Sequence, residues 1–434
     1  DRERLLISGS VAHFDSSVAT TVAIAETLAV RYPGDPEAQN LLGQALENRG
    51  DYGPAVAAYN RAVALDSAAG AAAGPFCRLC SALGDLSRTY LWWDSLDASV
   101  RTARRNLALR PREAGGWLDL AEPLFRLGKR AEAIAALDRR ESMTSPNALS
   151  RELLRRDLIR SGEFEELDRQ LIADLDNPSP DVRGSSRWLL LISLRNQGRL
   201  REAKALAWDR IIPGTNRVAD IETETVHQML IAMDSGEPDV MVRGMSAAAD
   251  GTLRNSLSPG TRARLATWYL TLAGTAMAAA GDTAAVRRLA DSVERVGRES
   301  SFGRDPRLHH FLRGLVLQRS GRHGEAVQEF QLAVHSLSDG YTRINFEMAR
   351  CLIQLGRSAE AVAVLEPALR GGVDGSNTYV SRTELHETLA QAFEQAGQRD
   401  SARIHYAAVE RAWRHADPRF ASRYEVAKAK SAGS

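Results

Sequence analysis

One stretch of the chain, residues 36–66, constrains the fold more than any other. Its sequence, PEAQNLLGQALENRGDYGPAVAAYNRAVALD, contains two segments with helical periodicity on either side of Gly50 and Asp51. Gly50 suits the end of a helix, because glycine adopts the positive φ that a helix C-terminus often requires. We therefore expect two antiparallel helices. Their apolar faces would be formed by Leu42, Ala45 and Leu46 in the first helix and by Ala55, Tyr59 and Ala62 in the second.

The sizes of the side chains in this stretch indicate how one pair of helices packs on another. Gly43 leaves room for a neighbouring helix, and Tyr59 fills the gap between units. The order and spacing of these residues resemble the consensus of the tetratricopeptide repeat (TPR), whose period is ~34 residues. The resemblance implies a helix pair that stacks on further pairs of the same kind.

Most of the chain resembles imperfect copies of this unit. We predict an all-α fold, a right-handed TPR superhelix (α-solenoid) of about ten helix pairs, some degenerate. Within it we expect a longer loop at residues 211–222. The predicted division is an N-terminal helix pair at 1–35, the TPR solenoid at 36–410, and a C-terminal capping helix with a frayed tail at 411–434. The glycines that mark the later units are Gly128, Gly162, Gly198, Gly236, Gly281, Gly321, Gly356 and Gly397.

Composition excludes several classes of function. The 434 residues exceed what one globular core usually organises, whereas a solenoid grows by adding units. The net charge is +1, from 56 basic and 55 acidic residues, which argues against a nucleic-acid-binding protein. The longest apolar run, residues 268–280, is too short to cross a bilayer, so we predict no membrane span. Because the chain has neither an initiator Met nor a signal peptide, we expect a processed product or a fragment of a longer protein.

No motif predicts catalysis. The sequence lacks GxSxG, HExxH and phosphate-loop patterns, so we predict a protein that is not an enzyme and binds no cofactor and no metal. Three cysteines do not form a disulfide framework. Cys77 and Cys80 form a CxxC, which three readings fit: two small apolar residues on a helix face, a local disulfide, or a redox role.

The two ends resemble one bacterial group. The segments DRERLLI at residues 1–7, RYPGDPEA at 31–38 and WRHADP at 413–418 are similar to the C-terminal TPR arms of bacterial membrane-tethered serine/threonine kinases and winged-helix regulators. The resemblance implies an extracytoplasmic location, periplasmic or at the cell surface. A cytoplasmic location stays open, because the balanced charge and unpaired cysteines fit either compartment.

A partner site is expected on the concave face that the first helices of successive units form. Arginines concentrate in the middle of this face, and guanidinium groups hold carboxylates in bidentate pairs. We therefore predict that a protein or peptide with an acidic segment or a C-terminal carboxylate binds there, near Arg156, Arg160, Arg195 and Asn196. The alternative is that these arginines form a solvated helix face. The predicted site residues are Arg126, Arg156, Arg160, Trp188, Arg195, Asn196, Arg319, Phe346 and Arg350. Phe311, Gln318, Arg343, Gln354 and Gln391 occupy further concave positions.

Three functions fit this architecture. The first is a non-enzymatic scaffold that binds a foreign peptide or protein in the concave groove. The second is self-assembly of copies of the chain into an extracellular filament, since a contact that does not close makes a polymer. The third is the extracytoplasmic sensor arm of a signalling protein, with Trp92 and Trp93 as a ligand platform. Packing in the core or between repeats is the alternative for these tryptophans.

Overall fold

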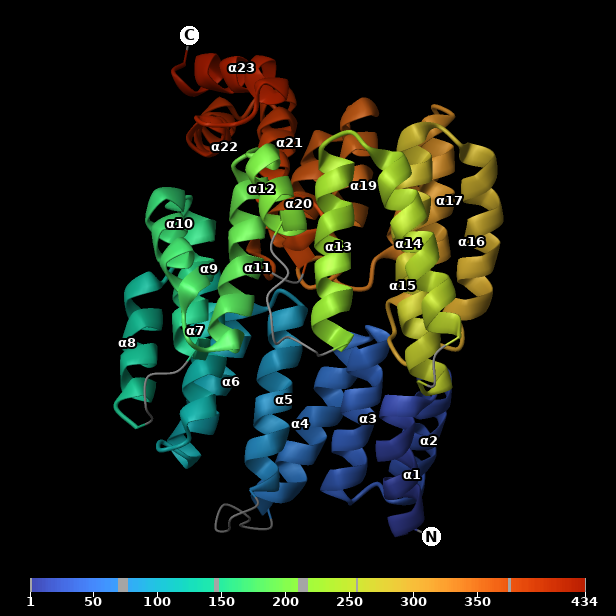
Figure 1. Ribbon diagram of the computed structural model, residues 1–434. Coiled ribbons are helices and arrows are strands. Elements are labelled where there is room, and N and C mark those ends of the chain that lie inside the picture. The colour runs from blue at the N-terminus through green and yellow to red at the C-terminus, as the bar shows by residue number, and fades with distance from the viewer. Residues whose placement is uncertain are drawn as a thin grey trace. The chain divides into compact units, whose positions relative to one another are not determined.

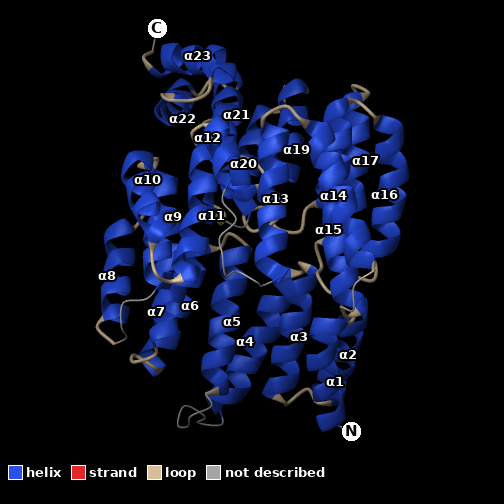
Figure 2. Ribbon diagram, in the orientation of Figure 1, coloured by secondary structure: helices blue, strands red, loops and turns tan. Residues whose placement is uncertain are grey.

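Helices account for all the regular secondary structure in the described part of the chain. A computed structural model describes residues 2–68, 77–143, 148–209, 218–254, 257–373 and 376–433. Within these ranges it contains 23 α-helices and four short 3-10 helices and no strand (Figures 1 and 2). Helices α1 to α22 are consecutive pairs joined by short connections, and α23 follows, which confirms the predicted all-α repeat architecture.

The helix pairs follow the chain in order. The first six pairs are α1 (Arg2–Asp15) with α2 (Val18–Arg31), α3 (Pro36–Arg49) with α4 (Tyr52–Ala68), α5 (Arg78–Trp92) with α6 (Leu96–Leu109), α7 (Ala114–Arg126) with α8 (Arg130–Glu141), α9 (Ala148–Ser161) with α10 (Phe164–Ala173), and α11 (Pro180–Asn196) with α12 (Leu200–Asp209). The others are α13 (Val218–Asp234) with α14 (Pro238–Leu253), α15 (Pro259–Ala280) with α16 (Thr283–Gly297), α17 (Leu308–Arg319) with α18 (His323–Ala333), α19 (Thr342–Gln354) with α20 (Ser358–Arg370), and α21 (Arg382–Gln395) with α22 (Arg399–Trp413), followed by α23 (Ala421–Ser431).

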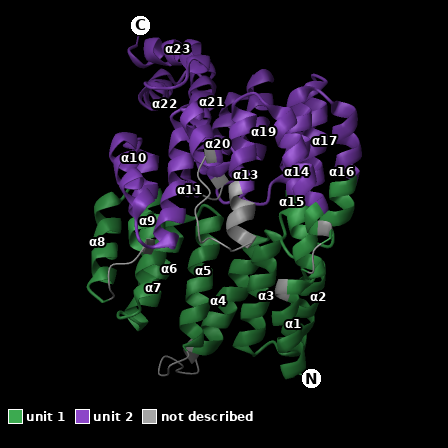
Figure 3. Cartoon of the chain, viewed as in Figure 1, with its two compact units in different colours: residues 1–153, 251–268, 292–308 green, residues 154–250, 269–291, 309–434 purple. Residues whose placement is uncertain are grey.

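Contacts between residues divide the chain into two compact units (Figure 3). Unit 1 contains residues 1–153, 251–268 and 292–308, and unit 2 contains residues 154–250, 269–291 and 309–434. Helices α15 and α16 each contribute one end to unit 1 and the other to unit 2. The division at residues 35 and 410 stays a prediction.

Small and large side chains meet across two of the helix pairs where the repeat pattern places them. A Cβ on Gly43 of α3 would lie 2.7 Å from the ring of Tyr59 on α4, and a Cβ on Gly314 of α17 would lie 2.5 Å from the ring of Phe330 on α18. Tyr59 and Phe330 are fully buried. The glycine therefore lets an aromatic ring fill the space between two helices, as the sequence pattern predicts.

Turn glycines follow nine of the eleven first helices in the described residues, α1 and α5 being the exceptions. Gly50 has a φ of 88°, and its N–H donates to the carbonyls of Glu47 and Leu46. At the equivalent place after α5 the chain has Asp94, with a φ of 57°. The two tryptophans before it differ: Trp92 is half-buried, with the Arg88 guanidinium 5.5 Å from its ring centroid, and Trp93 is 47% exposed. Trp93 is therefore not a core residue.

In unit 1, a segment near residue 300 docks on the first repeats. The Val18 N–H donates to the Ser300 carbonyl at 3.1 Å. The Asn48 amide donates to the Ser301 carbonyl at 2.9 Å, and its oxygen accepts from the Gly303 N–H at 3.2 Å. These bonds connect residues more than 250 positions apart, so local periodicity cannot predict them.

Replacing Gly303 with alanine is expected to lower the free energy of unfolding by about 1–3 kcal/mol, as overpacking typically does. A Cβ there would lie 1.9 Å from the carbonyl oxygen of Asn48, a backbone atom that cannot move aside cheaply. Gly115→Ala is the matched control, since a Cβ at that helical position meets no atom within 4 Å. Urea unfolding of both variants measures the difference. Equal stabilities would contradict this account of the docking.

In unit 2, the C-terminal segment lies across the turns of earlier repeats. The Asp417 carboxylate accepts from the Arg201 N–H in the first turn of α12 at 2.9 Å, and the Asp417 N–H donates to the Gly198 carbonyl at 3.0 Å. A Cβ on Gly198 would lie 3.0 Å from both Ala416 and Phe420. The WRHADP segment therefore caps a helix that it follows by more than 200 residues.

Two local predictions differ from the structure. The tail from Ala427 was expected to fray, but α23 continues through Ser431, because Ala427 is buried and the Ser431 hydroxyl donates to the Glu410 carboxylate at 2.6 Å. Residues 211–222 were expected to form a loop, but α13 already begins at Val218, and residues 210–217 lie outside the described ranges. The sequence SAAGAAAG at residues 67–74 predicts a small-residue connector, and most of it also lies outside them.

Candidate functional site

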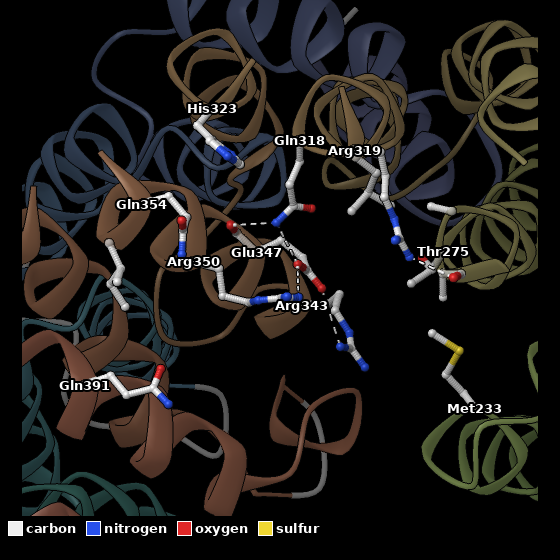
Figure 4. A pocket seen from close by; sticks show the side chains of 14 residues that line it. Met233, Thr275, Gln318, Arg319, His323, Arg343, Glu347, Arg350, Gln354 and Gln391 are labelled. Carbon is white, nitrogen blue, oxygen red and sulfur yellow. Dashed lines mark hydrogen bonds and ion pairs between the residues drawn. The ribbon is translucent and has the colours of Figure 1, made fainter. Parts of the chain in front are cut away.

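First helices of unit 2 surround a cavity of about 690 Å³ that we call the arginine cavity (Figure 4). Its walls come mainly from α13, α15, α17, α19 and α21, the helices that the repeat pattern places on the concave face. Its size lies within the range of ordinary ligand pockets. Its lining residues are Met233, Thr275, Ala278, Ala279, Leu315, Gln318, Arg319, His323, Arg343, Glu347, Arg350, Ile353, Gln354 and Gln391.

A single carboxylate organises the polar wall of the arginine cavity. Glu347 is 6% exposed, and its carboxylate accepts from the Gln318 amide at 3.0 Å and from the Arg350 guanidinium at 3.0 Å. The Arg343 guanidinium lies 3.6 Å from the other carboxylate oxygen and donates to the Tyr379 carbonyl at 3.1 Å. Burial lowers the pKa of Arg343, but Glu347 together with the more distant Tyr341, Glu384 and Asp234 raises it overall. Arg343 is therefore a charged structural residue.

Two arginines reach the cavity with exposed side chains. The Arg350 side chain is 55% exposed, and Arg319, the last residue of α17, is also exposed. Arg319 donates one bond to the Ala279 carbonyl at 2.7 Å. Phe346 is buried, and the Arg343 and Arg350 guanidinium groups lie 5.4 and 5.6 Å from its ring centroid. Of the predicted site residues, Arg319 and Arg350 thus line the arginine cavity, and Phe346 packs against Arg350 without lining it.

Arg195 and Asn196 lie in a buried part of unit 2, where they form hydrogen bonds with other residues of the same unit. Arg195 is 4% exposed, and its guanidinium donates to Asp234 at 2.7 Å and to the Thr378 carbonyl at 2.5 Å. Asn196 is 2% exposed; its side chain accepts from the Arg382 N–H at 2.7 Å, and its carbonyl accepts from the Thr383 hydroxyl at 2.6 Å. A residue with these contacts does not face a groove, so our proposal omits both.

The remaining predicted site residues lie apart from the arginine cavity. The Arg126 side chain in unit 1 is 4% exposed and pairs with Glu122 at 2.9 Å. Arg156 and Arg160 are half-buried on α9. Trp188 on α11 is also half-buried, and its ring meets His227 edge-on at 5.9 Å between centroids. Phe311 was assigned to the concave face but is fully buried, because it packs against Phe330 and Tyr341.

The sequence pattern found part of the cavity and missed the rest. Gln318, Arg343, Gln354 and Gln391 line it at their assigned concave positions. Met233 and Thr275 were missed, since they belong to repeats whose register is weak. His323 was missed because it begins α18, a second helix. Glu347 was missed because it does not occupy an assigned concave position. Its contacts with Gln318, Arg343 and Arg350 reveal its role.

None of the described helices has a stretch both long enough and apolar enough for a membrane span. Within the same residues, His, Cys, Asp and Glu side chains do not gather in groups of three or more that could hold a metal ion.

Comparison with known families identifies the repeat. Residues 22–72, which include α3 and all of α4, match the family model described as tetratricopeptide repeat. Residues 22–72 therefore contain a tetratricopeptide repeat. The match covers the stretch whose spacing predicted the repeat, and eight of the nine helix pairs that follow α4 have a turn glycine after their first helix. The search of curated proteins found no match.

Solved structures of TPR proteins are among its structural matches. One is the TPR domain of P58(IPK), with 15% sequence identity, 91% of this chain and 98% of that chain covered, and a TM-score of 0.24. Another is a tetratricopeptide repeat protein from Parabacteroides merdae, with 14% identity, 64% and 94% coverage, and a TM-score of 0.33. No conclusion on function follows from likenesses of this size. The resemblance of the chain ends to kinase and regulator arms stays a prediction.

Proposed function

We propose that this protein is a non-enzymatic interaction module and that its arginine cavity binds an acidic segment or a C-terminal carboxylate of a partner protein. TPR repeats generally mediate protein–protein interaction. The observation that carries the proposed ligand is the charge of the lining, which contains three arginines and one glutamate. Because Arg343 and Arg350 share Glu347, the cavity keeps an excess of positive charge for a ligand.

The exposed arginines supply the charged contacts of the proposed complex. A guanidinium has five N–H donors in a planar fork. The contact from Arg319 to the Ala279 carbonyl and the contact from Arg350 to Glu347 each use one nitrogen of that fork. The amides of Gln354 and Gln391, both exposed, can bond to the backbone of an extended peptide. An acidic peptide would therefore meet charged and neutral donors together.

Selection from a library of random peptides with free C-termini tests the proposal. The wild-type protein is expected to enrich peptides rich in Asp and Glu or dependent on the terminal carboxylate, and Arg319→Glu/Arg350→Glu is expected to lose this enrichment. Arg243→Glu/Arg399→Glu is the matched control, since both arginines are exposed in unit 2 and outside the cavity lining. Failure to enrich acidic peptides, or equal enrichment by the cavity variant, would overturn the proposal.

A further inference from the structure

A disulfide lies at the start of α5 in unit 1. It joins Cys77, the residue that caps this helix, to Cys80 in its first turn. The Cys80 N–H donates to the Cys77 sulfur at 3.1 Å. The two residues are only 6% and 4% exposed. Of the three readings that the CxxC left open, the structure therefore excludes two free thiols on a helix face.

The same two cysteines line a second cavity, of about 500 Å³, which we call the cysteine cavity. All its lining residues belong to unit 1, so it is separate from the arginine cavity. Arg78, Arg88 and Arg110 also line it. Arg88 pairs with Asp85 at 2.7 Å, and Arg110 pairs with Glu113 at 3.0 Å. The disulfide is thus reached through a space large enough for a small molecule, although little of it lies on the outer surface.

The surroundings of Cys77 favour its thiolate form after reduction. The N-terminus of a helix stabilises a negative sulfur, and CxxC thiols at such places are typically reactive. The hydrogen bond from the Cys80 N–H points at this sulfur. A disulfide that closes so short a ring restricts the unfolded chain little, so it contributes less stability than one that closes a long loop. These features suit exchange better than a structural cross-link.

We propose that Cys77–Cys80 is a thiol–disulfide exchange site that a low-molecular-weight thiol reduces from within the cysteine cavity. The entering thiolate attacks the sulfur of Cys80, the bond between the two cysteines breaks, and the electron pair moves to Cys77, whose thiolate the Cys80 N–H holds. A second thiol then attacks the mixed disulfide, and Cys80 leaves as a thiolate that takes up a proton. Two thiols are oxidised to one disulfide, and the protein gains two electrons.

The burial of both cysteines decides the class of reductant. A protein dithiol would have to bring its own active-site sulfur against an exposed one, and neither cysteine is more than 6% exposed. A small thiol can enter the cavity instead. This proposal does not depend on peptide binding by unit 2, so either one can fail without the other.

Titration of the folded wild-type protein in mixtures of reduced and oxidised glutathione tests the exchange site. Acid quenching, alkylation and peptide mass mapping count the thiols at Cys77 and Cys80 and distinguish them from the buried thiol of Cys351. We expect the pair to pass reversibly between disulfide and dithiol while the circular dichroism spectrum stays that of the folded protein. Structural disulfides resist the glutathione pool. A pair that is reduced only on unfolding, or that never forms a disulfide with oxidised glutathione, would overturn the proposal.

Two further measurements test which class of thiol reduces the disulfide and which cysteine sulfur it attacks. Dithiothreitol is expected to reduce the pair at least ~10-fold faster than a thioredoxin-type protein at equal concentration, because only the small dithiol enters the cavity. Each single variant leaves one of the two thiols. We expect Cys77, left in Cys80→Ser, to react faster with iodoacetamide at neutral pH than Cys80, left in Cys77→Ser. A faster protein reductant would overturn the assignment to small thiols, and a faster Cys80 would overturn the order of attack. Neither result depends on the wild-type titration.

Discussion

Replacing Arg195 with alanine is expected to lower the free energy of unfolding by about 3–5 kcal/mol, the usual cost of removing one partner of a buried ion pair. Arg195 joins α11 to Asp234 of α13 and to the Thr378 carbonyl. Burial raises the pKa of the Asp234 carboxyl, and the Arg195 guanidinium opposes this rise. Without the guanidinium, Asp234 and the Thr378 carbonyl both lose their charged donor inside the protein.

Arg169→Ala is the matched control for this prediction. Its side chain is 74% exposed and pairs with Glu166, which is 41% exposed, and such an exposed ion pair typically contributes about 0–1 kcal/mol. Urea unfolding followed by circular dichroism measures both variants. If the two lose the same small amount of stability, the buried junction between α11 and the segment before α21 does not hold unit 2 together as described.

Replacing Glu47 with glutamine is expected to remove a pH dependence of stability worth about 3 kcal/mol. Glu47 is 5% exposed in unit 1, and its carboxylate accepts from the Tyr59 and Thr89 hydroxyls. Burial raises the pKa of Glu47 to about 7, although Arg88 opposes the rise. The folded protein therefore holds this proton more tightly than the unfolded chain does.

The sign of the effect follows from that difference. Below pH 4.5, the ordinary pKa of Glu, both states are protonated and the contribution to stability is complete. As the pH rises toward 7, the folded protein must give up a proton that the unfolded chain has already lost, so the free energy of unfolding falls. We expect Glu47→Gln to gain stability relative to wild type across this window. Tyr59→Phe, which keeps the carboxylate, should retain the wild-type slope. A Glu47→Gln difference that is equal at pH 4.5 and pH 8 would contradict the assignment.

The repeat architecture could be predicted because its signals are local. Gly43 with Tyr59, and Gly314 with Phe330, recur at a fixed spacing inside single helix pairs, and turn glycines such as Gly50 end the first helices. Each of these signals lies within about 20 residues. The same reasoning placed Arg319 and Arg350 on the face where the structure has a cavity.

The part that could not be predicted depends on contacts between distant repeats. Asn196 occupies a concave position by its register, yet it bonds with Arg382 and Thr383, which lie more than 180 residues away. Asp417 follows the end of α22 and caps α12, which no local pattern shows. A rule that assigns concave positions assumes an open stack of repeats. Within unit 2, however, the last repeats cover residues of earlier ones, so a position that the rule places in the groove can be buried.

The most direct test of the central claim is a fluorescence anisotropy titration with one acidic peptide recovered by the selection. We expect Arg319→Glu/Arg350→Glu to raise the Kd at least ~10-fold, which corresponds to about 1.4 kcal/mol, at unchanged thermal stability. Arg243→Glu/Arg399→Glu makes the same change in net charge and is expected to bind as the wild type does. If both double variants bind the peptide as the wild type does, or weaken binding equally, the arginine cavity is not the site of recognition.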